Sequence, residues 1–93
     1  MVTLQQLRKK IERIDTKIIF LVAERQKLAP QFCLVKAKMN LSLHQKGREK
    51  ELLRKYCEIA QGKKISNGLI EKIFPILFQA SLKEQRRCLK KKD

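Results

Sequence analysis

Two cations share one face of a long predicted helix. Reading from Leu4 in alternating steps of three and four residues meets apolar side chains at ten of eleven positions, and the exception is Arg25. Lys36 follows eleven residues later, about 20° past three full turns and about 16 Å along the axis. Two long side chains can close around a small anion across that gap. The position of Arg25 is equally compatible with a structural ion pair or with a polar residue that sets helix register.

A carboxylate and two neutral hydrogen-bonding groups lie on the apolar faces of two further predicted helices. Glu49, next to Arg48, precedes apolar residues of the second helix by three, four and seven positions. A solvated first-turn carboxylate, favoured by the helix dipole, is the alternative for Glu49. Ser81 and Gln85 are four residues apart and face the same way on the third helix. Together with Arg25 and Lys36, these positions predict a cationic pocket inside a helical bundle.

Arg8 cannot reach that pocket from the same helix. It lies about 25 Å from Arg25 along the axis and about 100° around it. If two first helices pair antiparallel about a two-fold axis near residue 19, Arg8 of one chain falls between Arg25 and Lys36 of the other. The alternative is that Arg8 is one of 23 cations on the surface.

Chemistry that depends on a nucleophile, a metal or a cofactor has no support in the sequence. His44 stands alone in a predicted connection, and no cysteine has a histidine partner nearby. The three cysteines (Cys33, Cys57 and Cys88) are odd in number and have no CxxC spacing, so neither a disulfide framework nor a zinc site is indicated. We expect reduced thiols in a cytoplasmic protein, with no metal and no cofactor.

Three helices must position these residues: one long, at about 3–40, one short, at about 48–60, and one medium, at about 66–88. Gly and Pro number only five together, which excludes an all-β fold. We therefore predict a single all-α domain over residues 1–93, ending in a frayed basic segment from Arg86 to Lys92.

The first helix contains Pro30 but its apolar stripe resumes in phase beyond that residue, so we expect a kinked, continuous helix. At about 55 Å it is too long for one such chain to cover, and its exposed stripe predicts association. Pro75 suggests a second bend, in the third helix.

The net charge of +14 raises the possibility of nucleic-acid binding. However, the charges spread along all segments and only five residues are aromatic, so we interpret the excess as solvated surface that attracts an anionic substrate. The longest apolar run, residues 18–23, is far below the roughly 20 residues that span a bilayer. The N-terminal sequence has no pattern of an export signal. We expect no nucleic-acid or membrane partner.

In the order and spacing of these residues, the chain resembles the all-helical chorismate mutases over about residues 4–85. The matching stretches are Leu7-Arg8 with Ile11 and Ile14-Asp15, then Ala23-Glu24-Arg25, Lys36-Ala37-Lys38, Arg48-Glu49, and Ala80-Ser81 with Gln85. The resemblance implies an intertwined helical homodimer with two equivalent sites. It also implies conversion of chorismate to prephenate by an intramolecular Claisen rearrangement, in phenylalanine and tyrosine synthesis.

The resemblance further implies roles for the charged residues that bind the substrate and stabilise its rearrangement. Arg25, with Arg8 of the partner chain, would hold the two substrate carboxylates. Lys36 and Gln85 would hydrogen-bond the ether oxygen, where negative charge grows as the C–O bond breaks.

Four more positions would complete the site by this resemblance. Glu49 would accept a hydrogen bond from the substrate hydroxyl, Ser81 would help to hold a carboxylate, and Arg48 would support the charge network. Gln45 stands where several family members have Asp. Two alternatives remain open: an isochorismate-pyruvate lyase on the same scaffold, and a non-catalytic basic helical module for nucleic-acid binding or dimerisation.

Overall fold

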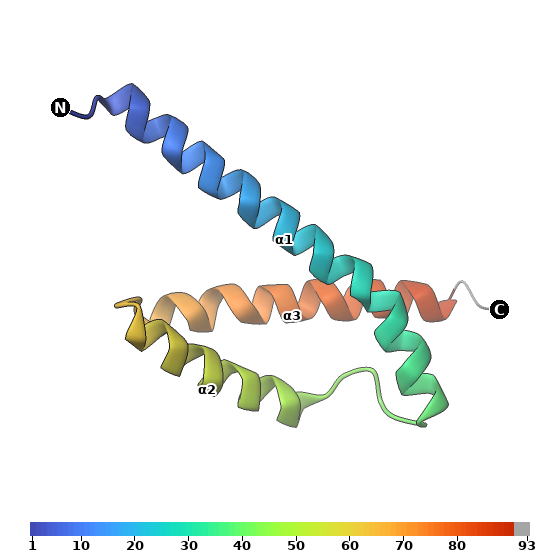
Figure 1. The fold of residues 1–93 in the computed structure, drawn as a ribbon. Helices are drawn as coiled ribbons and strands as arrows, with labels where there is room; N and C mark the ends of the chain where they lie inside the picture. The colour runs from blue at the N-terminus through green and yellow to red at the C-terminus, as the bar shows by residue number, and fades with distance from the viewer. Residues whose placement is uncertain (91–93) are drawn as a thin grey trace.

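The computed structural model describes residues 1–90, which form three helices: α1 (Leu4–Lys38), α2 (Lys46–Gly62) and α3 (Asn67–Lys90) (Figure 1). Helix α3 packs against both α1 and α2. No strand occurs among these residues. The prediction of an all-α chain with one long, one short and one medium helix is confirmed.

Helix α1 begins at a capping box and continues through its proline. The Thr3 hydroxyl accepts from the Gln6 backbone N–H at 3.1 Å, and the Gln6 side-chain carbonyl accepts from the Thr3 N–H at 2.9 Å. Pro30 lies inside the helix without ending it. The axis of α1 changes direction toward its C-terminal end (Figure 1), as expected where a proline removes a backbone hydrogen bond.

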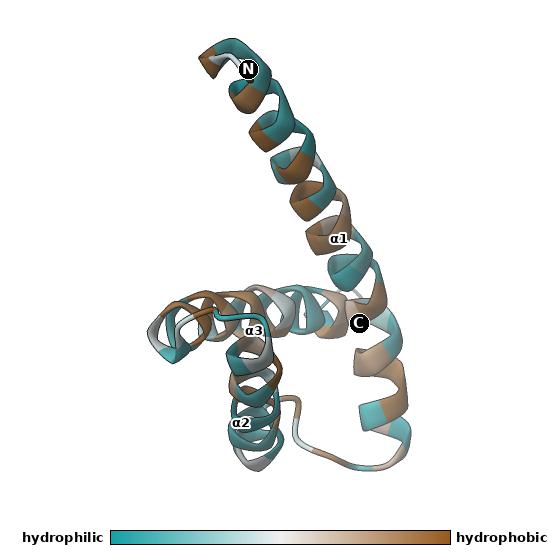
Figure 2. Ribbon diagram, turned by 60° about the vertical axis from the view of Figure 1, so that its left-hand side comes forward, coloured by the Kyte–Doolittle hydropathy of each residue, from teal (hydrophilic) through white to brown (hydrophobic). Residues whose placement is uncertain are grey.

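The N-terminal part of α1 projects away from the other two helices (Figure 1). Its apolar residues recur along the helix (Figure 2), and six of them are each 49–62% exposed. They are Leu4, Leu7, Ile11, Ile14, Ile18 and Leu21. The buried residues of α1 are instead Ala29 and Cys33, in its C-terminal part. One chain therefore leaves the predicted stripe uncovered.

The boundaries of α2 and α3 differ from the predicted ones by a few residues. Helix α2 begins at Lys46 rather than at residue 48, so the flexible Gly47 lies in its first turn. Helix α3 continues to Lys90, which corrects the expectation of a frayed end from Arg86; residues 91 and 92 of that segment lie outside the described residues. The half-buried Cys88 side chain reaches the backbone carbonyl of Pro30 at 4.0 Å, so contact with α1 supports these last turns.

Helices α2 and α3 share a small core. Cys57, Ala60 and Ile70 are buried together, and Tyr56 and Phe74 pack against them with ring centroids 4.6 Å apart. The series continues along α3, because Phe74 and Phe78 have centroids 6.1 Å apart. Phe78 is only 8% exposed. Aromatic rings thus extend from the α2–α3 core along α3.

We expect Ile70→Ala to lower the free energy of unfolding by about 2 kcal/mol or more, because it removes buried apolar volume from this core. Ile59→Ala is the matched control: Ile59 is 56% exposed on α2, so we expect a change within about 0.5 kcal/mol. Urea unfolding followed by circular dichroism at one protein concentration measures both variants. Equal losses would show that the core does not lie where the structure has it.

Candidate active site

A cavity of about 140 Å³ lies among the three helices and the α1–α2 connection. Its polar walls come from all three helices and from the residue before α2. These residues are Arg25, Lys36, Gln45, Arg48, Glu49, Ser81 and Gln85. Phe32, Leu52 and Phe78 are among the apolar walls. The structure therefore brings together every predicted site residue except Arg8.

A chain of hydrogen bonds joins α1 to α3 across this cavity. The Lys36 ammonium donates to Gln85 Oε1 at 2.9 Å and to the Leu43 carbonyl at 2.7 Å. Gln85 Nε2 donates to Ser81 Oγ at 3.2 Å. Gln85 is only 5% exposed, so its amide needs these partners. An ammonium has three N–H donors and a side-chain amide has two, so Lys36 and Gln85 each keep one N–H beyond these contacts.

Partial burial lowers the pKa of Lys36 below its ordinary value of 10.5. Desolvation is the larger cause, because removal from water disfavours the charged ammonium. Electrostatic interactions with Glu49 and, to a smaller extent, with Cys33 oppose it and raise the pKa in part. The carboxylate across the cavity therefore helps to keep Lys36 protonated.

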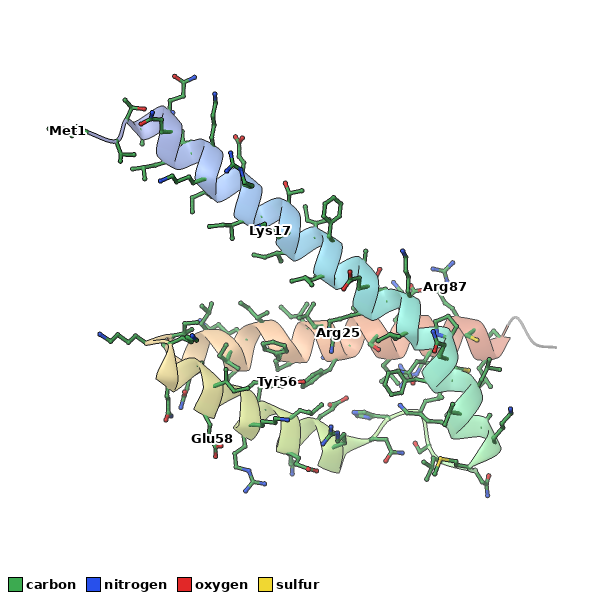
Figure 3. The ribbon with its side chains drawn as sticks, in the orientation of Figure 1. Met1, Lys17, Arg25, Tyr56, Glu58 and Arg87 are labelled. Atoms are coloured by element: carbon green, nitrogen blue, oxygen red, sulfur yellow. The ribbon has the colours of Figure 1, made fainter. Side chains whose placement is uncertain are left out.

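Arg25 reaches from α1 toward α3 (Figure 3). Its Nη1 lies 3.4 Å from the Leu77 carbonyl, a contact at the long limit of a hydrogen bond. Among residues 1–90, no carboxylate pairs with this guanidinium. The structural ion pair considered for Arg25 is thus absent from this part of the chain, and most of its five N–H donors remain for a ligand.

The segment at the start of α2 supplies Glu49, Arg48 and Gln45, and each of these side chains also contacts a neighbour in the chain. Glu49 Oε1 lies 3.4 Å from His44 Nε2. Arg48 Nη1 lies 3.3 Å from Glu51 Oε1 in an exposed pair. Gln45 Nε2 donates to the Ser42 carbonyl at 2.6 Å, which leaves its side-chain oxygen as an acceptor. The Gln45 amide thus stabilises the connection between α1 and α2.

Arg8 lies on the exposed N-terminal part of α1, outside the cavity of its own chain. This agrees with the helix geometry, which separates it from Arg25 by about 25 Å along the axis. Within one chain the cavity therefore lacks Arg8, which the resemblance implies as the second arginine that holds a substrate carboxylate.

Sequence reasoning missed the contact of His44 with Glu49 and the wall formed by Phe78. The sequence does not predict this contact, because His44 lies in a connection and no periodicity relates a loop residue to a helix face. The spacing of Phe74 and Phe78, four residues apart on one helix, was a signal that could have placed Phe78 inward.

The arrangement can bind a small anion and hydrogen-bond to it. Three cations, one carboxylate and neutral donors surround the cavity, and no nucleophile lies beside a general base there. Residues 1–90 contain no cluster of three or more His, Cys, Asp or Glu side chains that could hold a metal ion. None of their helices is long and apolar enough to cross a membrane.

The family model of chorismate mutase type II matches residues 7–86, which include all eight predicted site residues. The chain belongs to this family, and the resemblance inferred from its sequence is confirmed.

Named relatives agree with the family match. The chain is 30% identical over 86 residues to the "Chorismate mutase" of Methanocaldococcus jannaschii, covering 92% of this chain and 87% of that protein. It is 43% identical over 56 residues to the "Bifunctional chorismate mutase/prephenate dehydratase" of Aquifex aeolicus, covering 60% of this chain and 16% of that protein. A bifunctional relative of the same name from Buchnera aphidicola is 30% identical over 84 residues, covering 90% of this chain and 22% of that protein. The chain thus spans only a small part of the two bifunctional relatives.

The pKa of Lys36 provides a direct test of the electrostatics. We expect an NMR titration of ¹³Cε-labelled lysines to give Lys36 a midpoint below 10.5, with Lys36→Met identifying its signal. Glu49→Gln should lower that midpoint further, because it removes the charge that favours the ammonium.

Glu51→Gln is the control for this titration, because Glu51 pairs with Arg48 at an exposed position. It should leave the Lys36 midpoint unchanged. A midpoint above 10.5, or equal shifts in the two variants, would contradict the described placement of Lys36 and Glu49.

Proposed function

We propose that the cavity converts chorismate to prephenate. One observation carries the proposal: seven polar residues from three helices and a connection, expected to act together, line one cavity. The family match supports the same activity and favours neither the lyase nor the nucleic-acid-binding module. The dehydratase activity named in the bifunctional relatives is not proposed for this chain.

The chemistry of this reaction suits the groups present. In the rearrangement the ether C–O bond breaks while a C–C bond forms within the same molecule, so no external nucleophile or base is required. A catalyst must hold the substrate in a compact conformation and place hydrogen-bond donors where charge develops. A cavity with fixed cations and amides can supply both.

The two substrate carboxylates are assigned to arginines. Arg25 has unused donors and a planar fork that matches a carboxylate in two places. Arg8 of the partner chain would hold the second carboxylate. Ser81, at the end of the hydrogen-bond chain from Lys36, would support one of these contacts.

The ether oxygen is assigned to Lys36 and Gln85. Their mutual hydrogen bond of 2.9 Å fixes both side chains before the substrate arrives, and each retains an N–H. Donors placed in advance need little reorganisation as charge grows on the oxygen. The Lys36 ammonium is the stronger hydrogen-bond donor of the two, because its hydrogen bond is charge-assisted.

The substrate hydroxyl is assigned to Glu49, whose carboxylate can accept its hydrogen bond. Arg48 would add positive charge at the mouth of the cavity after release from its exposed pair with Glu51. Gln45 would contribute its oxygen and its second N–H, because only one N–H is used by the Ser42 carbonyl.

A homodimer is part of the proposal. The six exposed apolar residues of the N-terminal part of α1 form a stripe that a second α1 can cover, which would remove this apolar surface from water. The same segment carries Arg8, so an antiparallel pairing of two α1 helices would bring it to the other chain's cavity. Cytoplasmic location, a single domain over residues 1–93 and a role in aromatic amino acid synthesis stay predictions.

Assays of chorismate loss with product identification test the activity. We expect prephenate from the native chain, and a reduction in kcat/KM of about a hundred- to a thousandfold in Arg25→Ala, because a preorganised donor is lost. Arg25→Lys should remain impaired, because an ammonium cannot bind a carboxylate with two parallel hydrogen bonds.

Arg54→Ala controls for the loss of one positive charge outside the cavity and should keep native turnover. Release of pyruvate from added isochorismate, without prephenate from chorismate, would favour the lyase. Salt-sensitive binding of duplex DNA without turnover would favour the nucleic-acid-binding module.

Mixing two inactive variants tests whether Arg8 acts across the dimer. Arg8→Ala and Arg25→Ala, unfolded together in equal amounts and refolded, should regain about a quarter of native activity. About half of the dimers are then mixed, and each mixed dimer has one intact site of two. Light scattering should give twice the 11.0 kDa of one chain.

Each variant refolded alone is the control for this experiment and should stay inactive. A mixture as inactive as its components, or a monomeric mass, would contradict the shared site.

A further inference from the structure

We propose that His44 is a positioning residue for Glu49, and this inference rests on the proposed function. Its ring contacts one carboxylate oxygen from outside the cavity, which leaves the other oxygen to accept the hydrogen bond of the substrate hydroxyl. The inference adds to the site a residue that does not itself line the cavity.

The contact places His44 behind Glu49. His44 Nε2 lies 3.4 Å from Glu49 Oε1, and the two side chains are about one-third exposed. Glu49 lines the catalytic cavity, whereas His44 lines a separate recess between α2 and α3 that Glu49 and Phe78 share. A contact of this length in a substrate-free site can tighten when the substrate binds.

The connection that carries His44 is held by side-chain hydrogen bonds on both sides of this residue. The carbonyl of the preceding Leu43 accepts from Lys36 at 2.7 Å. Ser42 Oγ donates to the His44 carbonyl at 3.2 Å, and the following Gln45 donates to the Ser42 carbonyl at 2.6 Å. Three residues of this set, Lys36, Leu43 and Gln45, also line the cavity.

Cations from two helices line the cavity and the recess that Glu49 borders. Lys36 and Arg25 line the same cavity from α1, and Arg48 lines it from α2. Lys46 and Lys50 line the recess on the other side, while Ser81 and Gln85 of α3 are neutral.

The attraction between Glu49 and Lys36 raises the pKa of Lys36 and partly offsets the effect of burial. Without His44, the carboxylate could turn toward Lys36 and occupy the N–H that is assigned to the ether oxygen. Holding Glu49 in place thus serves both binding and turnover.

A double-mutant cycle tests this role, with steady-state kinetics of chorismate loss for each protein. We expect His44→Ala to lower kcat/KM about two- to tenfold, the size expected for ordering one flexible side chain. In the Glu49→Gln background, His44→Ala should add no further loss, because the carboxylate on which it acts is gone. His44→Gln should recover most of the activity of His44→Ala, since its amide can donate to the carboxylate.

Lys46→Gln is the control for removing positive charge beside Glu49, and it should leave kcat/KM unchanged. Circular dichroism melting identifies a merely structural effect. Additive losses in the cycle, or no recovery in His44→Gln, would overturn the role of His44 while leaving the mutase activity intact. If the native chain forms no prephenate, the proposed function fails and this inference fails with it.

Discussion

The hydrogen bond between Lys36 and Gln85 is the interaction on which the site depends. It joins α1 to α3, gives the partly buried Lys36 ammonium an acceptor and gives the buried Gln85 amide a donor. Burial alone disfavours the ammonium, so the arrangement holds only with acceptors and a carboxylate nearby. The same contacts that stabilise this cation also hold it in the wall of the cavity.

Much of the fold could be predicted because helical periodicity is a local property of the sequence. The stripe from Leu4 predicted a helix that continues through Pro30, and the structure has one. Arg25, Lys36, Ser81 and Gln85 could be placed from spacing alone, because residues three, four or eleven apart face one way on a helix. Helix boundaries were predicted less accurately. Helix α3 ends at Lys90, beyond the predicted end, and its last turns contact α1 through Cys88, a tertiary contact that leaves no local signal.

The remaining part of the site depends on how a non-helical segment folds back. Nothing in the pattern of residues 39–45 indicates that Leu43 offers its carbonyl to Lys36 or that His44 lies against Glu49. Arg8 cannot be placed for a different reason, because its proposed role requires a second chain. Both cases lie outside what hydrophobic periodicity can describe, since neither depends on which face of a helix is apolar.

The hydrogen bond from Lys36 to the Leu43 carbonyl has a consequence for the length of the connection between α1 and α2. Surface loops usually tolerate insertions and deletions, because few contacts depend on their register. Here an added or deleted residue would replace the carbonyl that meets the ammonium and shift the ring that meets Glu49. Under the proposed function, the length of this short segment is therefore constrained, although its side chains are mostly polar and partly open to water.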